Sequence, residues 1–196
     1  MKKKMRIVLI VALILAFSTG YAIINKTNAI YDVSYDTENY IGVELLNNDS
    51  VTQRFVCNEK NLDGISLKIT GQGDMSGSAL SYELSEVDSG KVVSIGTQNI
   101  DKLESGKFYN LTFEKVEGTE EKEYQLTISL KSGESGIVLY YTPDDNNTFQ
   151  KNKSELNGTL VLRTVTHRFD FETFFVTLCF VVYIIGFMKW IYNLFK

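Results

Sequence analysis

Two adjacent tyrosines and the short polar run that follows them are the residues best suited to a chemical role. Tyr140 and Tyr141 stand in a segment with strand-like alternation, so their side chains should point to opposite faces. One ring should therefore face away from the core, although packing of both rings remains the alternative. An exposed ring can cover the apolar C–H face of a sugar, while carboxylate and amide oxygens can bind its hydroxyl groups. The sequence thus predicts a glycan site formed by these tyrosines and the polar run Asp144, Asp145, Asn146 and Asn147.

The same polar run has a second interpretation, which is a cation site. Asp144 to Asn147 offer several oxygens in succession, and calcium is bound by oxygen ligands. The spacing is not that of an EF-hand loop, and an Asx-rich turn after Pro143 explains the same residues. We therefore assign no metal and no cofactor, and keep calcium as the open alternative.

Enzymatic chemistry finds little support in the sequence. His167 is the only histidine and lies close to an apolar segment, and no G-x-S-x-G nucleophile motif is present. Carboxylates are plentiful, but Glu117, Glu120 and Glu121 fall in a charged, turn-like run. We expect a protein that is not an enzyme.

Charge excludes one class of partner. Residues 25–168 hold 14 of the 20 basic residues and 22 of the 24 acidic residues, a formal charge of −8. Such a domain repels phosphate backbones, so we expect no nucleic-acid partner. Cys57 and Cys179 fall in a strand-like run and in an apolar segment, so they should not form a disulfide.

The N-terminal segment has the pattern of a membrane anchor. A cluster of basic residues precedes the uncharged run 7–24, and we expect a transmembrane helix over residues 5–24. A cleaved signal peptide is the alternative, because Gly20-Tyr21-Ala22 has the small-x-small pattern of a cleavage site. The positive-inside rule places this cluster in the cytoplasm, where it anchors the chain at the interface through Lys2, Lys3, Lys4 and Arg6.

A second apolar segment closes the chain. Residues 173–188 carry no charge, and we expect a transmembrane helix over residues 171–192. Lys189, Trp190 and Tyr192 follow, which are residue types that anchor a helix at headgroup depth. The lipid bilayer is thus a predicted partner, with both termini cytoplasmic and the middle of the chain extracytoplasmic.

The middle of the chain alternates with period 2. Segments such as 65–69, 80–84 and 124–130 place apolar residues on one face, and turn residues separate about nine such runs. We predict an all-β, antiparallel, jelly-roll-like β-sandwich over residues 40–168, flanked by the two transmembrane helices. Residues 25–39 show no period and are predicted to be a linker, and residues 143–156 a long polar loop.

The strand pattern also resembles a known family. The positions that carry the resemblance are Val51-x-Gln53-x-Phe55, Leu62-x-Gly64-Ile65-x-Leu67, Leu80-x-Tyr82-x-Leu84, Gly90-x-Val92-Val93, Phe108-Tyr109-x-Leu111-x-Phe113 and Tyr124-x-Leu126-Thr127-Ile128. They are similar to jelly-roll modules that resemble carbohydrate-binding domains, found in bacterial membrane proteins linked to surface-polysaccharide synthesis. The resemblance spans residues 50–142 and consists of core and turn positions, so it implies the fold more than an activity.

These observations lead to two functional hypotheses. The first is an accessory protein of a bacterial cell envelope that binds an envelope glycan or a membrane enzyme of polysaccharide synthesis. The second is a scaffold or assembly subunit of a membrane complex that binds no sugar. An exposed aromatic platform would favour the first, and an apolar surface patch would favour the second.

Overall fold

The computed structural model describes residues 2–131 and 135–196, without the side chains of Lys2 and Lys3. The expected turn at Ser132-Gly133, one of the turns expected between the strand-like runs, lies outside the described residues, as do the side chains of the predicted anchors Lys2 and Lys3. The chain forms two compact units, which are Thr27–Thr166 and the terminal segments Met1–Lys26 with His167–Lys196.

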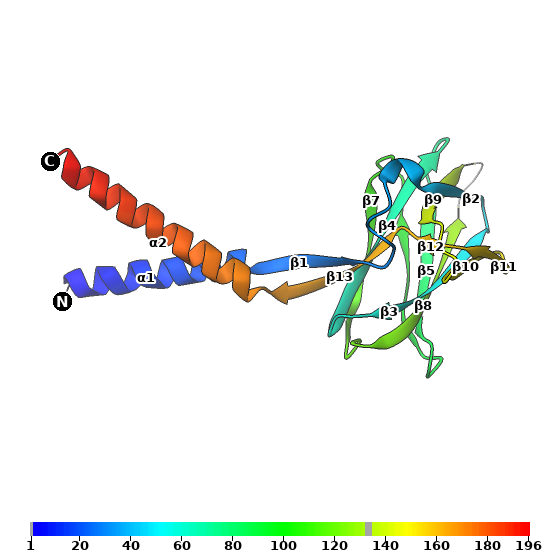
Figure 1. The fold of residues 1–196 in the computed structure, drawn as a ribbon, viewed down its shortest axis with the longest axis horizontal. Coiled ribbons are helices and arrows are strands. Elements are labelled where there is room, and N and C mark those ends of the chain that lie inside the picture. The colour runs from blue at the N-terminus through cyan, green and yellow to red at the C-terminus, as the bar shows by residue number, and fades with distance from the viewer. Residues whose placement is uncertain (1, 132–134) are drawn as a thin grey trace. The chain divides into compact units, whose positions relative to one another are not determined.

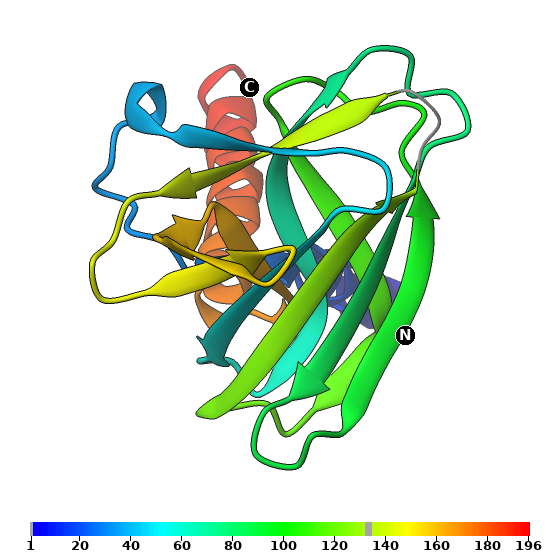
Figure 2. The same cartoon turned by 90° about the vertical axis from the view of Figure 1, so that its right-hand side faces the viewer.

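The predicted all-β sandwich is confirmed. Two antiparallel sheets face one another, as Figures 1 and 2 show. The seven-stranded sheet has the order β1-β13-β4-β9-β12, with β2 paired to β9 and β7 paired to β4. The six-stranded sheet has the order β11-β10-β3-β8-β5-β6. The strands are β1 Ile23–Ala29, β2 Ile41–Leu45, β3 Ser50–Cys57, β4 Asn61–Gln72, β5 Ala79–Glu86, β6 Val92–Asn99, β7 Phe108–Glu117, β8 Lys122–Lys131, β9 Gly136–Thr142, β10 Thr148–Lys151, β11 Ser154–Asn157, β12 Thr159–Leu160 and β13 Leu162–Phe169.

The period-2 pattern explains which side chains fill the space between the sheets. Alternate residues of the main strands point inward, and most of the inward positions are apolar. Five residues that the alternation predicts to be inward, one from each of five strands, are at most 4% exposed: Phe55, Leu67, Leu84, Leu111 and Leu126. Cys57 is buried in this core and Cys179 is exposed on a helix, and both are free thiols, as expected.

The polar stretch 143–156, predicted as a loop, contains a hairpin. Strands β10 and β11 pair antiparallel around Asn152 and Lys153, whose φ angles of 48° and 70° suit a two-residue turn. Phe149 is the only large apolar residue of β10, and it is 1% exposed with its ring centroid 5.0 Å from that of Tyr141. One buried ring therefore holds a strand that is otherwise polar.

The predicted linker 25–39 begins as a strand. β1 pairs with β13 at the edge of the seven-stranded sheet, and the Ile30 backbone N–H donates to the Leu162 carbonyl at 3.1 Å. The remainder is irregular apart from a single 3-10 turn at Thr37–Asn39.

Two apolar helices form most of the other unit. α1 spans Lys2–Tyr21 and α2 spans Phe171–Leu194, and both are long and apolar enough to cross a membrane. Ile23 and Ile24, which we expected to extend the first helix, belong to β1. α2 begins at Asp170, whose carboxylate accepts hydrogen bonds from the Thr173 backbone N–H at 2.9 Å and from its hydroxyl at 2.7 Å. Lys189, Trp190 and Tyr192 lie in the last turns of α2.

Candidate functional site

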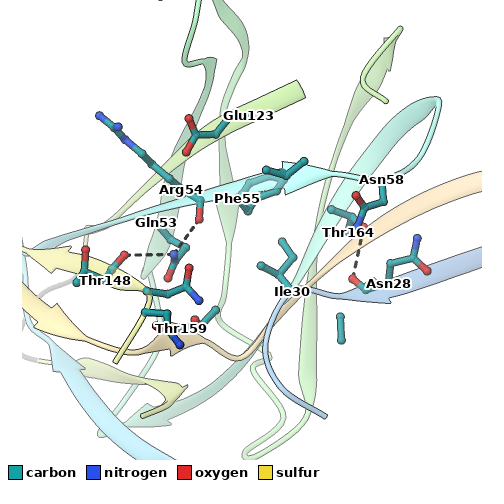
Figure 3. A pocket seen from close by; sticks show the side chains of 14 residues that line it. Asn28, Ile30, Gln53, Arg54, Phe55, Asn58, Glu123, Thr148, Thr159 and Thr164 are labelled. Carbon is teal, nitrogen blue, oxygen red and sulfur yellow. Dashed lines mark hydrogen bonds between the residues drawn. The ribbon is translucent and has the colours of Figure 1, made fainter. Parts of the chain in front are cut away.

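A cleft of about 460 Å³ lies between the two sheets of the sandwich (Figure 3). One wall is the end of β1 and the residue that follows it, and the other is the middle of β3. The lining is completed by Asn58 after β3, Glu123 of β8, the turn before β10, Thr148 of β10, and one residue each of β12 and β13. Its polar lining residues are Asn28, Gln53, Arg54, Asn58, Glu123, Asn146, Asn147, Thr148, Thr159 and Thr164.

Gln53 organises the floor of this cleft. Its side chain is 2% exposed, and its Nε2 donates to the Arg54 carbonyl at 2.8 Å and to the Thr148 carbonyl at 3.4 Å. Its Oε1 accepts the Leu160 backbone N–H at 3.1 Å. One amide therefore joins β3 and β10 of the six-stranded sheet to β12 of the other sheet.

Gln53 is not among the site residues predicted from the sequence, although its position carries a signal. Gln53 shares its face of β3 with Val51, Phe55 and Cys57, and all three are buried. A polar residue at an inward position of an apolar alternation needs hydrogen-bond partners in the core. That mismatch marks the point where a buried amide joins the two sheets beside the cleft.

The β1 wall is fixed by a second amide. Asn28 Nδ2 donates to Glu59 Oε1 at 2.7 Å, and the Asn28 carbonyl accepts the Thr164 hydroxyl at 3.4 Å. Asn28 is itself one of the residues that line the cleft. Asn58 is exposed on the same cleft, and no hydrogen bond of its side chain is described among residues 2–131 and 135–196. Both residues therefore offer amide groups to a ligand.

The predicted polar turn reaches the cleft through its amides. Asp144 accepts the Asn146 backbone N–H at 2.9 Å and the Asn147 Nδ2 at 2.5 Å, and these bonds hold the pKa of its carboxyl below the usual value. Asp144 thus shapes an Asx turn, while Asn146 and Asn147 line the cleft and Asp145 is exposed beside them. Within the described part of the chain, no group of three or more His, Cys, Asp or Glu side chains could hold a metal.

The two tyrosines lie on opposite faces of β9. Tyr141 packs against Phe149 and the core. Tyr140 is on the outer face of the seven-stranded sheet, where its hydroxyl lies 3.1 Å from that of Thr70. Neither ring is among the described residues that line the cleft. The structure therefore brings Asn146 and Asn147 to one surface and Tyr140 to another.

The cleft is close to neutral. Arg54 and Glu123 are the charged residues of its described lining, and Arg54 Nε donates to Gln125 Oε1 at 3.3 Å on the outer face of the sheet. The remaining polar lining is amide and hydroxyl, beside apolar groups of Ala29, Ile30, Phe55 and Val56. An uncharged site of this kind suits a neutral ligand that both donates and accepts hydrogen bonds.

No family model matches this chain. No curated protein matches it either. Solved structures with a similar arrangement of strands include a clostridial cysteine protease after propeptide cleavage, with 12% identity and a TM-score of 0.43. They also include the xylan-binding module CBM15, with 11% identity and a TM-score of 0.34. A third is a CBM6 module from Clostridium stercorarium in complex with cellobiose, with 15% identity and a TM-score of 0.30.

The matched portions differ in extent. The alignment covers 73% of this chain and 40% of the protease, so this chain spans well under half of that protein. It covers 67% of this chain and 97% of CBM15, and 61% of this chain and 91% of the CBM6 module. At such low identities and TM-scores, the function of this chain must be argued from its own residues.

Proposed function

We propose that this protein is a membrane-anchored binding protein, without catalytic activity, that holds a neutral sugar in the cleft between its sheets. The observation that supports this is the cleft lining, which combines amide and hydroxyl groups with an apolar wall and almost no net charge. Two terminal helices with the length and composition of membrane spans support the anchoring.

The chemistry of the lining matches that of a sugar. A side-chain amide carries a donor and an acceptor side by side, which can bind two neighbouring hydroxyl groups at once. The exposed side chain of Val56 and the partly buried Ile30 can contact the C–H groups of the ring. The volume of about 460 Å³ falls within the range of small-molecule sites.

The setting is part of the proposal. We place the sandwich on the extracytoplasmic side of a bacterial membrane, where it would serve the assembly of a surface polysaccharide beside a membrane enzyme. The basic residues Lys4 and Arg6 before the apolar run support this orientation through the positive-inside rule. An open cleft with few contacts should bind weakly, with a Kd on the order of 10⁻³ to 10⁻⁵ M.

The test is a titration of the full-length protein in mild, uncharged detergent with neutral oligosaccharides, measured by calorimetry. At least one oligosaccharide should bind, and Asn58→Ala should weaken it about tenfold, the loss of about 1.4 kcal/mol expected for one hydrogen-bonding group. The matched control is Gln150→Ala, which removes an exposed amide that does not line the cleft.

Two results would reject this function. One is the absence of binding by every neutral oligosaccharide, and the other is an equal effect of Asn58→Ala and Gln150→Ala. If the protein binds no sugar and instead co-purifies with a membrane enzyme, the scaffold hypothesis replaces this one.

A further inference from the structure

Outside the cleft, one face of the sandwich gathers cations and aromatic rings. We call it the tyrosine–cation face; it consists of Tyr31, Tyr40, Lys68, Phe108, Tyr140 and Arg163. The register of the seven-stranded sheet explains why these residues lie together. Lys68 is the cross-strand partner of Phe108. Arg163 is the cross-strand partner of Ser66, which lies two residues before Lys68 on the same strand. Side chains two residues apart on a strand share a face, so these two cations are neighbours.

Both cations are held by rings. The Arg163 guanidinium carbon lies 3.9 Å from the centroid of the Phe108 ring, and its Nη2 donates to the Tyr31 hydroxyl at 3.0 Å. The Lys68 Nζ lies 4.9 Å from the Tyr40 ring centroid and 5.9 Å from that of Tyr140. Cation–π contacts of this kind fix the positions of charged groups without neutralising them.

Neither cation has a carboxylate partner among the described residues. Among residues 2–131 and 135–196, no ion pair of Lys68 or Arg163 is described, whereas Lys107, Lys122 and Lys151 each pair with an acidic residue. The buried Arg163 Nε also has no hydrogen-bond acceptor within the described part of the chain. The domain as a whole has a formal charge of −8, whereas this face carries two half-buried cations without a described ion pair.

A hollow of about 320 Å³ adjoins this face at Phe108. Lys102, Lys107 and Asn110 line it, together with Glu104, which pairs with Lys107. The Lys102 ammonium therefore adds a third cation without a described ion pair beside the ring that stacks on Arg163.

We propose that the tyrosine–cation face is a second binding site, specific for an anionic sugar that carries a carboxylate or phosphate group. The anion would contact the Lys68 ammonium and the Arg163 guanidinium, and the sugar ring would lie against Tyr140 or Tyr40. This site is separate from the cleft and does not depend on it.

The geometry favours a sugar over a lipid headgroup. Phosphates of a bilayer surface reach protruding lysines, but Lys68 and Arg163 are half-buried among rings. A single anionic group on a small ring can enter between those rings and stack on one of them. Burial and a hydrogen bond with Tyr31 raise the pKa of Tyr40 to about 12, so its hydroxyl remains neutral even at the alkaline pH at which an ordinary tyrosine ionises.

The experiment uses full-length protein in uncharged detergent micelles and calorimetry. The probes are a galacturonic acid tetramer, the same tetramer as its neutral methyl ester, glucose 1-phosphate and inorganic phosphate. We expect the tetramer or glucose 1-phosphate to bind, with affinity falling as salt rises. Lys68→Met should weaken that binding at least tenfold, Lys68→Arg should restore part of it, and Asn58→Ala in the cleft should leave it unchanged.

The control is Lys131→Met, which removes an exposed lysine from the six-stranded sheet and should have no effect. A thermal melt of each variant excludes unfolding as the cause. The proposal is overturned if neither anionic sugar binds, if the methyl ester or inorganic phosphate binds as tightly, or if Lys131→Met weakens binding as much as Lys68→Met. Binding to phosphatidylglycerol vesicles without binding to either sugar would also overturn it.

Discussion

The Gln53 side chain accepts a hydrogen bond from the Leu160 backbone N–H at 3.1 Å, across 107 residues of sequence. Through the same amide, Gln53 donates to the carbonyls of Arg54 and Thr148. The Gln53 amide therefore joins the two sheets where they line the cleft. We therefore expect the Gln53 amide to affect both the stability of the sandwich and the geometry of the proposed sugar site.

Replacing Gln53 by alanine should destabilise the protein and alter the cleft. A buried donor or acceptor that loses its hydrogen-bond partner lowers the free energy of unfolding by about 1–3 kcal/mol. In this variant the Leu160 N–H and the carbonyls of Arg54 and Thr148 each lose the Gln53 amide as a partner. Chemical denaturation of the full-length protein in detergent would measure the loss. Gln150→Ala, on an exposed part of β10, should change the free energy of unfolding by less than about 0.5 kcal/mol. Equal losses in the two variants would contradict the role given to Gln53.

A second prediction concerns the register of β5 and β8 in the core. Leu84 of β5 and Leu126 of β8 are cross-strand partners, and both are at most 1% exposed. Truncating either to alanine should cost about 2–5 kcal/mol because a cavity is left in a packed interior. Gln125→Ala, on the opposite face of β8, should cost less than about 1 kcal/mol. A loss at Gln125 that matched the loss at Leu126 would mean that β8 is placed one residue out of register.

The β10–β11 turn is a sensitive point of the fold. The Asn152 Oδ1 accepts the Ser50 backbone N–H at 2.9 Å, and its Nδ2 donates to Asp49 at 2.6 Å. Asn152→Ala should therefore cost about 1–3 kcal/mol. Lys153→Gly should be neutral or stabilising, because glycine adopts the φ of 70° without steric cost. Thermal melts of both variants would test this, and a strong destabilisation by Lys153→Gly would refute it.

Asp49 should contribute to the loss of protein stability at acidic pH. Hydrogen bonds from the Leu46 backbone N–H and from Asn152 hold the pKa of its carboxyl below the usual value, and the Lys151 ammonium adds to this. A depressed folded-state pKa stabilises the protein above the unfolded pKa of about 3.9, and the stabilisation is lost as pH falls through the folded pKa. Melts between pH 6 and about pH 2 should show a shallower decline for Asp49→Asn than for the wild type. Identical pH profiles would show that Asp49 does not contribute.

The predicted topology can be tested in intact cells. In a cysteine-free background, Ser89→Cys places a thiol on the exposed turn between β5 and β6. A membrane-impermeant maleimide should label it without permeabilisation, if the sandwich is extracytoplasmic. Lys196→Cys should react only after permeabilisation, because both termini are predicted to be cytoplasmic. The reverse labelling pattern would invert the orientation.

The sequence by itself determined the layout of the chain. Two uncharged apolar runs, residues 7–24 and 173–188, predict helices long enough for a membrane, because length and hydropathy are local properties. Period-2 alternation identified the inward face of each main strand, and Phe55, Leu67 and Leu111 are buried as it requires. The Asx turn at Asp144 was also readable, since its hydrogen bonds reach no further than three residues.

Only the tertiary structure decided which residues meet. Alternation placed Tyr140 and Tyr141 on opposite faces, but it could not show that Asn146 faces the cleft while Tyr140 joins Lys68 on another surface. β10 pairs along a polar segment because a single buried ring, Phe149, fixes its face. Gln53 meets Leu160, and Arg163 meets Tyr31, across more than 100 residues. Such pairings depend on how distant strands register, which local sequence preferences do not encode.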